Sequence, residues 1–219
     1  EGRIWIGTED GGLNLYDRST DSFTQFKNKP GDKSSLSHNK VTAITQDKQG
    51  QLWIGTFGGG INRFDPQTRT FTQFGNDAKD PRSQSYRYVN DLHIDTRGRL
   101  WVATFGGGLN LFDRSKKSFV HYEHNPADVQ SISFNDITDL YEDSKGRFWV
   151  ATEGGGLNLM DREQGTFKRY QHSKSDPNSL SHNDVISLQE DKDGNLWIGT
   201  RNGGIRVLHE HLKTFSHYP

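Results

Sequence analysis

Side chains suited to ligand binding recur at two positions of this sequence, each occupied at intervals of 48 residues. The first position, two residues before a Gly-Gly pair, holds Glu9, Phe57, Phe105, Glu153 and Arg201. The second position holds Lys40, Tyr88, Asp136 and Asp184. Aromatic rings stack on the apolar faces of sugars, and charged groups orient hydroxyls. The pattern predicts a surface that binds a small glycan fragment, with solvated turns as the alternative.

Two of these carboxylates also fit an enzymatic interpretation. Asp136 and Asp184 occupy the same position in neighbouring repeats, and paired carboxyl groups can perform acid–base chemistry on a glycosidic bond. The alternative is that they are hydrated residues of a channel or bind a connecting loop. The chain contains no cysteine and no Gly-x-Ser-x-Gly turn, which removes two common settings for a nucleophile. We expect no catalytic residue and no cofactor, and keep a lyase or glycoside hydrolase as an alternative.

Two further segments have the residue types of a metal site. Asp191-Lys192-Asp193-Gly194-Asn195 begins like a calcium loop, but it lacks the glutamate that such a loop carries at its twelfth position. His209-Glu210-His211 would place two imidazoles on one face of a strand, with no third ligand indicated. We interpret the first segment as a hairpin turn and the second as a solvated edge. The sequence therefore predicts no metal.

The elements that position these residues follow the same period. The five tryptophans are 48 residues apart: Trp5, Trp53, Trp101, Trp149 and Trp197. Glycine pairs recur at the same interval, at 11–12, 59–60, 107–108, 155–156 and 203–204. A phenylalanine does so as well: Phe23, Phe71, Phe119, Phe167 and Phe215. A fixed period of this size with strand-type content is typical of radial or solenoidal repeats. We expect a planar ring at His38, Tyr86, Phe134 and His182 to serve packing rather than imidazole chemistry.

One repeat contains four predicted strands joined by tight turns, at 41–47, 52–56, 61–65 and 70–74. Four antiparallel strands per unit predict an all-β fold, a β-propeller of five 48-residue blades, in one domain over 1–219. The units are approximately 1–27, 28–75, 76–123, 124–171 and 172–219. The first unit lacks its innermost strand, so nineteen strands are expected. The ring is then open, or it is part of a larger ring. In a third alternative, the missing strand comes from a partner chain, from a second copy in a homo-oligomer or from a missing flank.

Composition limits the class of partner. Net charge is −1, with 27 basic and 28 acidic residues, so the chain has no excess charge for binding nucleic acid. No apolar run reaches the roughly 18 residues of a membrane span, and no signal peptide is present in the sequence. The chain starts at Glu1, which leads us to expect a processed, excised or engineered piece. The absence of cysteine is compatible with an oxidising compartment.

The repeated residues resemble a known family. Leu-Trp-Ile-Gly-Thr-x-x-Gly-Gly-Leu/Ile-Asn-x-Phe-Asp, followed by Thr-Phe-x-x-Phe/Tyr and Ser-Leu-Ser-His-Asn-x-Val, is similar to the two-component regulator propeller repeat. That repeat builds extracytoplasmic sensor regions of bacterial hybrid histidine kinases and related signalling proteins. The resemblance implies a non-enzymatic, ligand-sensing propeller in the periplasm. The alternative is a scaffold of amplified or engineered repeats with no native ligand.

Overall fold

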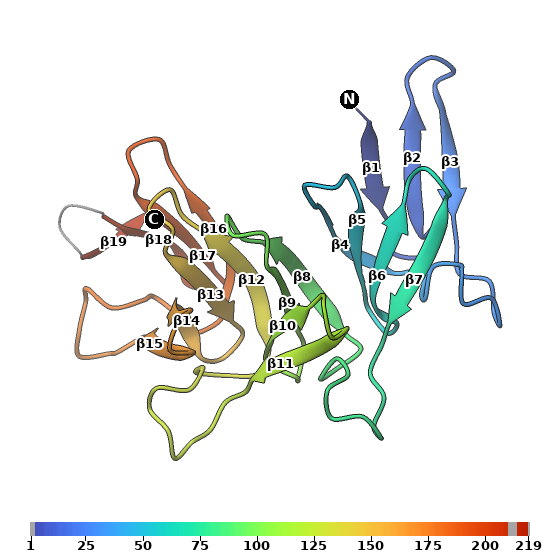
Figure 1. Ribbon diagram of the computed structural model, residues 1–219. Helices are drawn as coiled ribbons and strands as arrows, with labels where there is room; N and C mark the ends of the chain where they lie inside the picture. The colour runs from blue at the N-terminus through green and yellow to red at the C-terminus, as the bar shows by residue number, and fades with distance from the viewer. Residues whose placement is uncertain (1–2, 210–213, 219) are drawn as a thin grey trace. The chain divides into compact units, whose positions relative to one another are not determined.

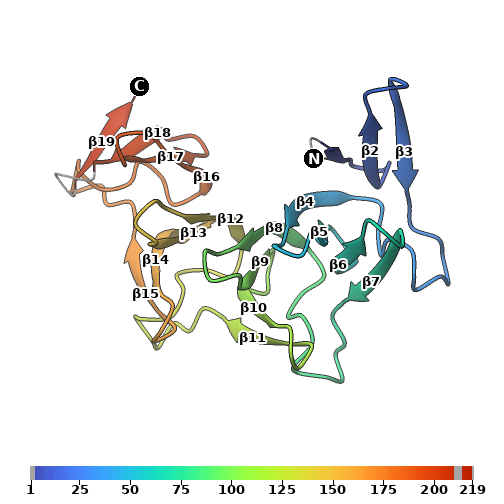
Figure 2. The same ribbon diagram turned by 45° about the horizontal axis from the view of Figure 1, so that its top comes forward.

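The computed structural model describes residues 3–209 and 214–218, and within these ranges all regular structure is β-strand. Nineteen strands form five sheets, each built from strands that follow one another in the sequence (Figure 1; Figure 2). One sheet has three strands, in the order β1-β2-β3, and four sheets have four strands. The all-β prediction is confirmed, as are the number of strands and the first unit's missing innermost strand.

The strands lie close to their predicted positions. The three-stranded sheet and the second sheet consist of β1 (Ile4–Gly7), β2 (Leu13–Asp17), β3 (Ser22–Phe26), β4 (Val41–Gln46), β5 (Leu52–Thr56), β6 (Gly60–Asp65) and β7 (Thr70–Phe74). The third sheet consists of β8 (Val89–Ile94), β9 (Leu100–Thr104), β10 (Leu109–Asp113) and β11 (Ser118–Tyr122). The last two consist of β12 (Ile137–Glu142), β13 (Phe148–Thr152), β14 (Gly156–Asp161), β15 (Thr166–Tyr170), β16 (Val185–Glu190), β17 (Leu196–Thr200), β18 (Gly204–Leu208) and β19 (Phe215–Tyr218).

The chain divides into two compact units. Unit 1 comprises Glu1–Thr104 and Asn110–Val120, and unit 2 comprises Phe105–Leu109 and His121–Pro219. Unit 1 thus contains the first two sheets and most of the third, and unit 2 contains the last two. The single domain over 1–219 stays a prediction.

Aromatic rings fill the space between neighbouring sheets within each unit. In unit 1, the Trp53 ring centroid lies 5.3 Å from that of Phe112, and Phe74 lies 4.9 Å from Phe112. In unit 2, Tyr170 bridges Trp149 and Phe215, at 5.8 Å from each. Such rings bury a large apolar area, which compensates for the low hydrophobic content of the chain, 30%. The middle three tryptophans are 0–1% exposed, whereas Trp5 and Trp197 are only partly buried.

A hydrogen bond, buried in three sheets and partly buried in the last, fixes each of these indoles except the first. In four sheets, the indole N–H donates to an aspartate six residues earlier, at 2.8–3.0 Å: Trp53 to Asp47, Trp101 to Asp95, Trp149 to Asp143 and Trp197 to Asp191. The aspartate sits in the tight turn after the sheet's first strand. Arginines complete the arrangement, since Arg99 donates to Asp95 at 2.8 Å and lies over the Trp101 ring. In the second, third and fourth sheets this aspartate is buried, and the acidic turn is therefore part of the core.

The glycine pairs are required by a close approach of two backbone segments. A Cβ at Gly155 would lie 2.4 Å from Oγ of Ser133, and one at Gly156 would lie 2.3 Å from the carbonyl oxygen of Tyr170. Gly156 also has a φ of 83°, a region that favours glycine. The hairpin between the second and third strands of a sheet is thus pressed against the connection that enters the same sheet.

Candidate functional site

The predicted ligand-binding residues come together at the hairpins between the second and third strands. The main-chain N–H of Phe57 donates to the carbonyl of Lys40 at 2.9 Å, and that of Glu153 donates to Asp136 at the same distance. Arg201 makes the equivalent bond to Asp184, also at 2.9 Å. The two sequence positions are therefore neighbours in space, because each hairpin tip is hydrogen-bonded to the entry of its own sheet's first strand.

In unit 1, five residues form what we call the Phe57 cluster: Glu9, Lys40, Phe57, Tyr86 and Tyr88. The ring centroids of Phe57 and Tyr88 are 4.5 Å apart, and those of Tyr86 and Tyr88 are 5.5 Å apart. The Lys40 ammonium lies 4.8 Å above the Phe57 ring and forms an ion pair with Glu9. Tyr86 and Tyr88 are 44% and 37% exposed, so their rings are available to a ligand.

In unit 2, four residues form what we call the Glu153 cluster: Asp136, Glu153, Asp184 and Arg201. An Arg201 guanidinium nitrogen lies 3.0 Å from a Glu153 carboxylate oxygen, and both side chains are partly exposed. Glu153 also forms an isolated β-bridge with Asp184 of the following sheet. Asp184 is held near His182, whose Nδ1 accepts the Asp184 main-chain N–H at 3.1 Å. This cluster presents carboxylates and a guanidinium, without an aromatic ring.

Phe105 is the remaining predicted residue. It follows β9 at a hairpin tip and is 41% exposed. Its side chain is therefore open to solvent at the same repeat position as Phe57 and Glu153.

Tyr86 is a member of the Phe57 cluster that the sequence interpretation assigned to packing. At two equivalent positions the ring lies beside a hairpin glycine: a Cβ at Gly58 would lie 3.4 Å from the His38 ring, and one at Gly154 would lie 3.4 Å from the Phe134 ring. His38 also acts through its imidazole, because its Nδ1 accepts the Lys40 main-chain N–H at 3.1 Å. Tyr86 differs because it also contacts Tyr88. The signal was present in the segment Tyr86-Arg87-Tyr88, since residues two apart in an extended chain point to the same side.

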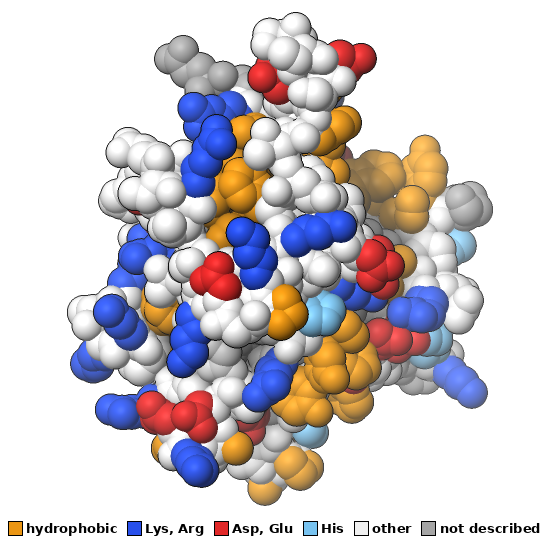
Figure 3. Space-filling model, turned by 90° about the vertical axis from the view of Figure 1, so that its right-hand side faces the viewer, with side chains coloured by type: hydrophobic (Ala, Val, Ile, Leu, Met, Phe, Trp, Pro, Cys, Tyr) orange, Lys and Arg blue, Asp and Glu red, His pale blue; other side chains and the backbone are white. Residues whose placement is uncertain are grey.

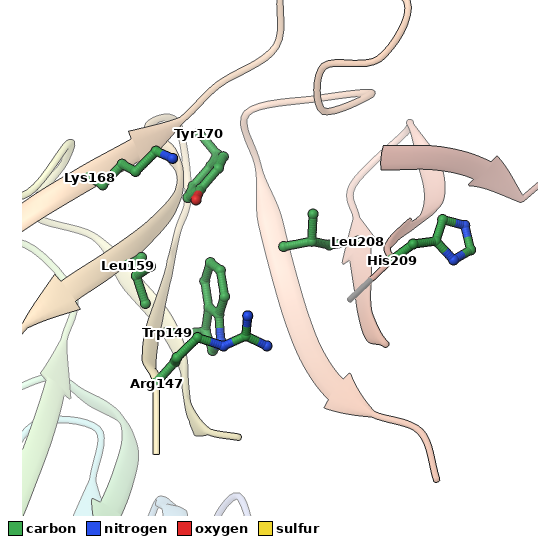
Figure 4. Close-up of a pocket in the computed structure, with 7 residues that line it drawn as sticks. All are labelled: Arg147, Trp149, Leu159, Lys168, Tyr170, Leu208 and His209. Carbon is green, nitrogen blue, oxygen red and sulfur yellow. The ribbon is translucent and has the colours of Figure 1, made fainter. Parts of the chain in front are cut away.

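A cavity in unit 2 was not predicted. It has a volume of about 250 Å³ and is lined by Arg147, Trp149, Leu159, Lys168, Tyr170, Leu208 and His209 (Figure 4). Lys168 lies over the Tyr170 ring at 4.8 Å, and His209 Nε2 is 2.6 Å from Ser216 Oγ. In the equivalent seam of unit 1, Phe112 occupies the place that Leu208 takes here. That seam also holds a cavity, of about 280 Å³, lined by Trp53, Phe74 and Phe112 among others, so the cavity is a feature of the repeat and not of the smaller side chain.

The metal interpretation meets no support in the described part of the chain, where no group of three potential ligands is close enough to hold an ion. The Asp191 carboxylate instead accepts bonds from Trp197 and Asn195, as a hairpin turn. Glu210 and His211 of the second segment lie outside the described residues, and His209 bonds to Ser216.

Comparison with family models identifies the repeat. The model described as "Two component regulator propeller" matches residues 35–58, 131–154 and 179–202. These three segments match the two-component regulator propeller repeat. Each matched segment covers the same part of the repeat, from the connection that enters a sheet to the following hairpin tip. Both positions of the predicted ligand-binding surface fall within that part of the repeat. No curated protein matches the sequence.

Solved structures place these repeats in a wider context. The extracellular domain assigned to the hybrid two component system BT3049 of B. thetaiotaomicron is 29% identical over 98% of this chain, with a TM-score of 0.80. The extracellular domain assigned to the one component system BT4673 of that organism is 23% identical over 99% of the chain, with a TM-score of 0.75. The present chain spans 26% of the length of each.

A third solved structure has the same fold and belongs to an enzyme. Virginiamycin B lyase from Staphylococcus aureus is 14% identical over 100% of this chain and 66% of its own, with a TM-score of 0.68. Identity at this level shows the fold alone. In the described residues of the present chain, no helix is long and apolar enough to cross a bilayer.

Proposed function

We propose that this chain is a ligand-binding part of an extracytoplasmic, non-enzymatic sensor of the two-component type, and that its ligand is a small glycan fragment. The observation that carries the proposal is the Phe57 cluster, in which partly exposed aromatic rings adjoin an ion pair. Likeness to an extracellular domain of a two component system, at 29% identity over nearly the whole chain, supports the cellular setting.

The Phe57 cluster has the chemistry that a pyranose requires. Stacked rings of Phe57 and Tyr88 offer an apolar surface to the C–H face of a sugar. The Lys40 ammonium donates hydrogen bonds and the Glu9 carboxylate accepts them, so together they can bind vicinal hydroxyls. Sites of this type combine an apolar wall with a few polar groups that fix orientation.

The Glu153 cluster is proposed as a polar subsite for a ligand of unit 2. Its carboxylates accept hydrogen bonds from hydroxyls, and Arg201 donates them in a planar fork. We assign Asp136 and Asp184 to binding rather than to acid–base catalysis. The enzymatic and scaffold interpretations remain as outcomes of the experiment below.

The test is a titration of the purified chain with a panel of defined oligosaccharides, followed by calorimetry and thermal shift. We expect one class of oligosaccharide to bind, and the Tyr88→Leu variant to weaken that binding by up to about tenfold, because an aromatic contact contributes up to about 1.5 kcal/mol. The matched control is Phe23→Leu, an aromatic residue of unit 1 that is 56% exposed and lies outside the cluster. It should bind like the parent chain.

Three results would contradict the proposal. Silence across the whole panel would favour a scaffold without a native ligand. Equal weakening by Tyr88→Leu and Phe23→Leu would place the ligand elsewhere. Turnover of an oligosaccharide that Asp136→Asn abolishes, with the fold intact by circular dichroism, would favour the enzymatic alternative.

A further inference from the structure

The cavity between the second and third sheets, in unit 1, has cationic walls. Its volume is about 280 Å³, and we call it the Arg63 cavity. Arg63 lines it from β6, and Arg114 and Lys117 line it from the turn that follows β10. Among the described lining residues, the one carboxylate is that of Asp47, which is buried and accepts four hydrogen bonds, including those of Trp53 and Arg114. The cavity therefore has three cations against one carboxylate whose acceptors are already used.

Arg63 stands at a position that is aliphatic in the other four repeats. The equivalent residues are Leu15, Leu111, Leu159 and Val207. Strand pairing places Arg63 directly between Trp53 and Thr72, on the same face of the sheet. The fold does not require a cation here, because an aliphatic side chain takes this position in every other repeat. Among the described residues, neither Arg63 nor Lys117 has a hydrogen-bond or ion-pair partner, so both are available to a ligand.

Unit 1 is also the positively charged part of the chain. By sequence it contains 17 lysines and arginines against 13 aspartates and glutamates, whereas unit 2 contains 10 against 15. The net charges are therefore +4 and −5, although the whole chain has a net charge of −1. On the side of the molecule where β2 and β3 of unit 1 lie, lysines and arginines cover more of the surface than acidic side chains do (Figure 3). A positive field of this kind raises the local concentration of anions.

The placement of the cations indicates a ligand with two separate anionic groups. Arg63 belongs to the second sheet, whereas Arg114 and Lys117 belong to the third, so the cations come from both sides of the seam. Guanidinium groups bind carboxylates through paired N–H donors. The partly exposed ring of Phe74, which also lines the cavity, offers an apolar contact. The volume equals that of about nine water molecules at about 30 Å³ each, which suits a ligand of roughly nine non-hydrogen atoms.

We propose that the Arg63 cavity binds a small aliphatic dicarboxylate, with one carboxylate at Arg63 and the other at Arg114 and Lys117. Thr72 supplies a hydroxyl donor beside Arg63, and the methylene groups of the ligand pack against Phe74. The cavity shares no residue with the Phe57 cluster or the Glu153 cluster. Binding of a dicarboxylate here is therefore independent of the proposed glycan ligand.

The test is a calorimetric titration of the chain with succinate and with glutarate at low ionic strength, compared with butyrate and with inorganic phosphate. We expect one dicarboxylate to bind per chain, about tenfold or more tightly than butyrate, because the second carboxylate adds charge-assisted hydrogen bonds. Arg63→Leu should weaken this binding about tenfold or more, and its fold should be retained because three other repeats have leucine at this position. Lys117→Gln should weaken the binding as well.

The matched control is Lys116→Gln, in the same turn as Lys117, because Lys116 pairs with Asp113 at 3.5 Å and does not line the cavity. This variant should bind the dicarboxylate like the parent chain, as should Tyr88→Leu of the Phe57 cluster. Failure of both dicarboxylates to bind would overturn the proposal, as would undiminished binding by Arg63→Leu with its fold intact by circular dichroism. Butyrate or phosphate that binds as tightly as the dicarboxylates would show a general anion site and likewise overturn it. Equal weakening by Lys116→Gln and Lys117→Gln would place the ligand elsewhere.

Discussion

The indole nitrogen of Trp101 donates a 3.0 Å hydrogen bond to Oδ2 of Asp95, and both side chains are shielded from solvent. The same carboxylate accepts main-chain bonds from Arg97 and Arg99 and a side-chain bond from Arg99. One acidic residue thus closes a turn, satisfies a buried donor and pairs with a cation. Because the bond between indole and carboxylate recurs with Asp47, Asp143 and Asp191, it stabilises every four-stranded sheet of the chain.

Truncation of this aspartate should be strongly destabilising. Asp95→Ala leaves the Trp101 N–H and the Arg99 guanidinium without their acceptor, and loss of one partner of a buried pair costs about 3–5 kcal/mol. Chemical denaturation of the variant measures the change in unfolding free energy. The control is Asp193→Ala, an exposed aspartate of an equivalent turn, for which we expect a change within about 0.5 kcal/mol. Equal effects of the two variants would contradict a buried role for Asp95.

Stability should fall in acid for the same reason. Burial acts to raise the pKa of Asp95, but hydrogen bonds from Trp101 and Arg99 outweigh it and hold that pKa below its usual value. The pKa of Asp191 is also lowered, chiefly by the hydrogen bond from Trp197. A carboxylate whose pKa is lowered by folding stabilises the native state above its unfolded pKa of about 3.9. That stabilisation is lost as pH falls through the lower folded pKa.

Urea titrations between about pH 2.5 and pH 7 check this expectation. The unfolding free energy of the parent chain should decline below about pH 4, and Asp95→Asn should show a shallower decline because one coupled carboxylate is gone. An unchanged acid slope in Asp95→Asn would mean that other carboxylates account for the acid sensitivity.

A turn with left-handed backbone geometry offers a stabilising change. The position between the third and fourth strands has positive φ in four repeats, with values of 49° at Asp21, 58° at Arg69, 52° at Lys117 and 73° at Gly165. A residue with a Cβ is strained there by about 1 kcal/mol, and glycine is not. Lys117→Gly should therefore raise the unfolding free energy by up to about 1 kcal/mol. The neighbouring Lys116→Gly, where φ is not positive, should not.

In the three preceding sheets, an asparagine of the third strand accepts a main-chain hydrogen bond from the serine that precedes the first strand. The last sheet has an arginine at this position. Arg206 stands where Asn62 and Asn158 lie, and its Nε is buried with no hydrogen-bond partner among the described residues. Arg206→Asn would allow a bond to the main chain at Ser181 and remove a buried unsatisfied donor. We expect a gain in unfolding free energy of about 1–2 kcal/mol. The reverse exchange, Asn158→Arg, should lower the unfolding free energy. A higher unfolding free energy for that variant would show that the asparagine hydrogen bond does not stabilise the sheet.

Much of the fold could be predicted because its signals are local and repeated. The strand at 52–56 and the turn at Gly50 follow from residue type and spacing alone, and the structure shows both, with a φ of 79° at Gly50. The predicted strand at 41–47 is also present, as β4, and it contains a register shift between Val41 and Ala43. In each case the neighbouring residues decide the conformation.

The candidate surface was predictable only in outline. That Lys40 lies beside Phe57 follows from strand pairing within one sheet, but the ion pair with Glu9 depends on how two sheets lean together, which periodicity does not specify. The role of Asp95 was missed for a similar reason. A turn aspartate that ends in the core looks identical, in sequence, to one that faces solvent.

The single tryptophan in every sheet has a spectroscopic consequence. Three of the indoles are sealed from water and two are partly hydrated, so their emission maxima should differ, with Trp5 and Trp197 the redder. Leaving one indole at a time, with phenylalanine at the other four positions, would convert the chain into a set of optical probes. Each probe would report the melting of its own layer and reveal whether the layers come apart together or in sequence.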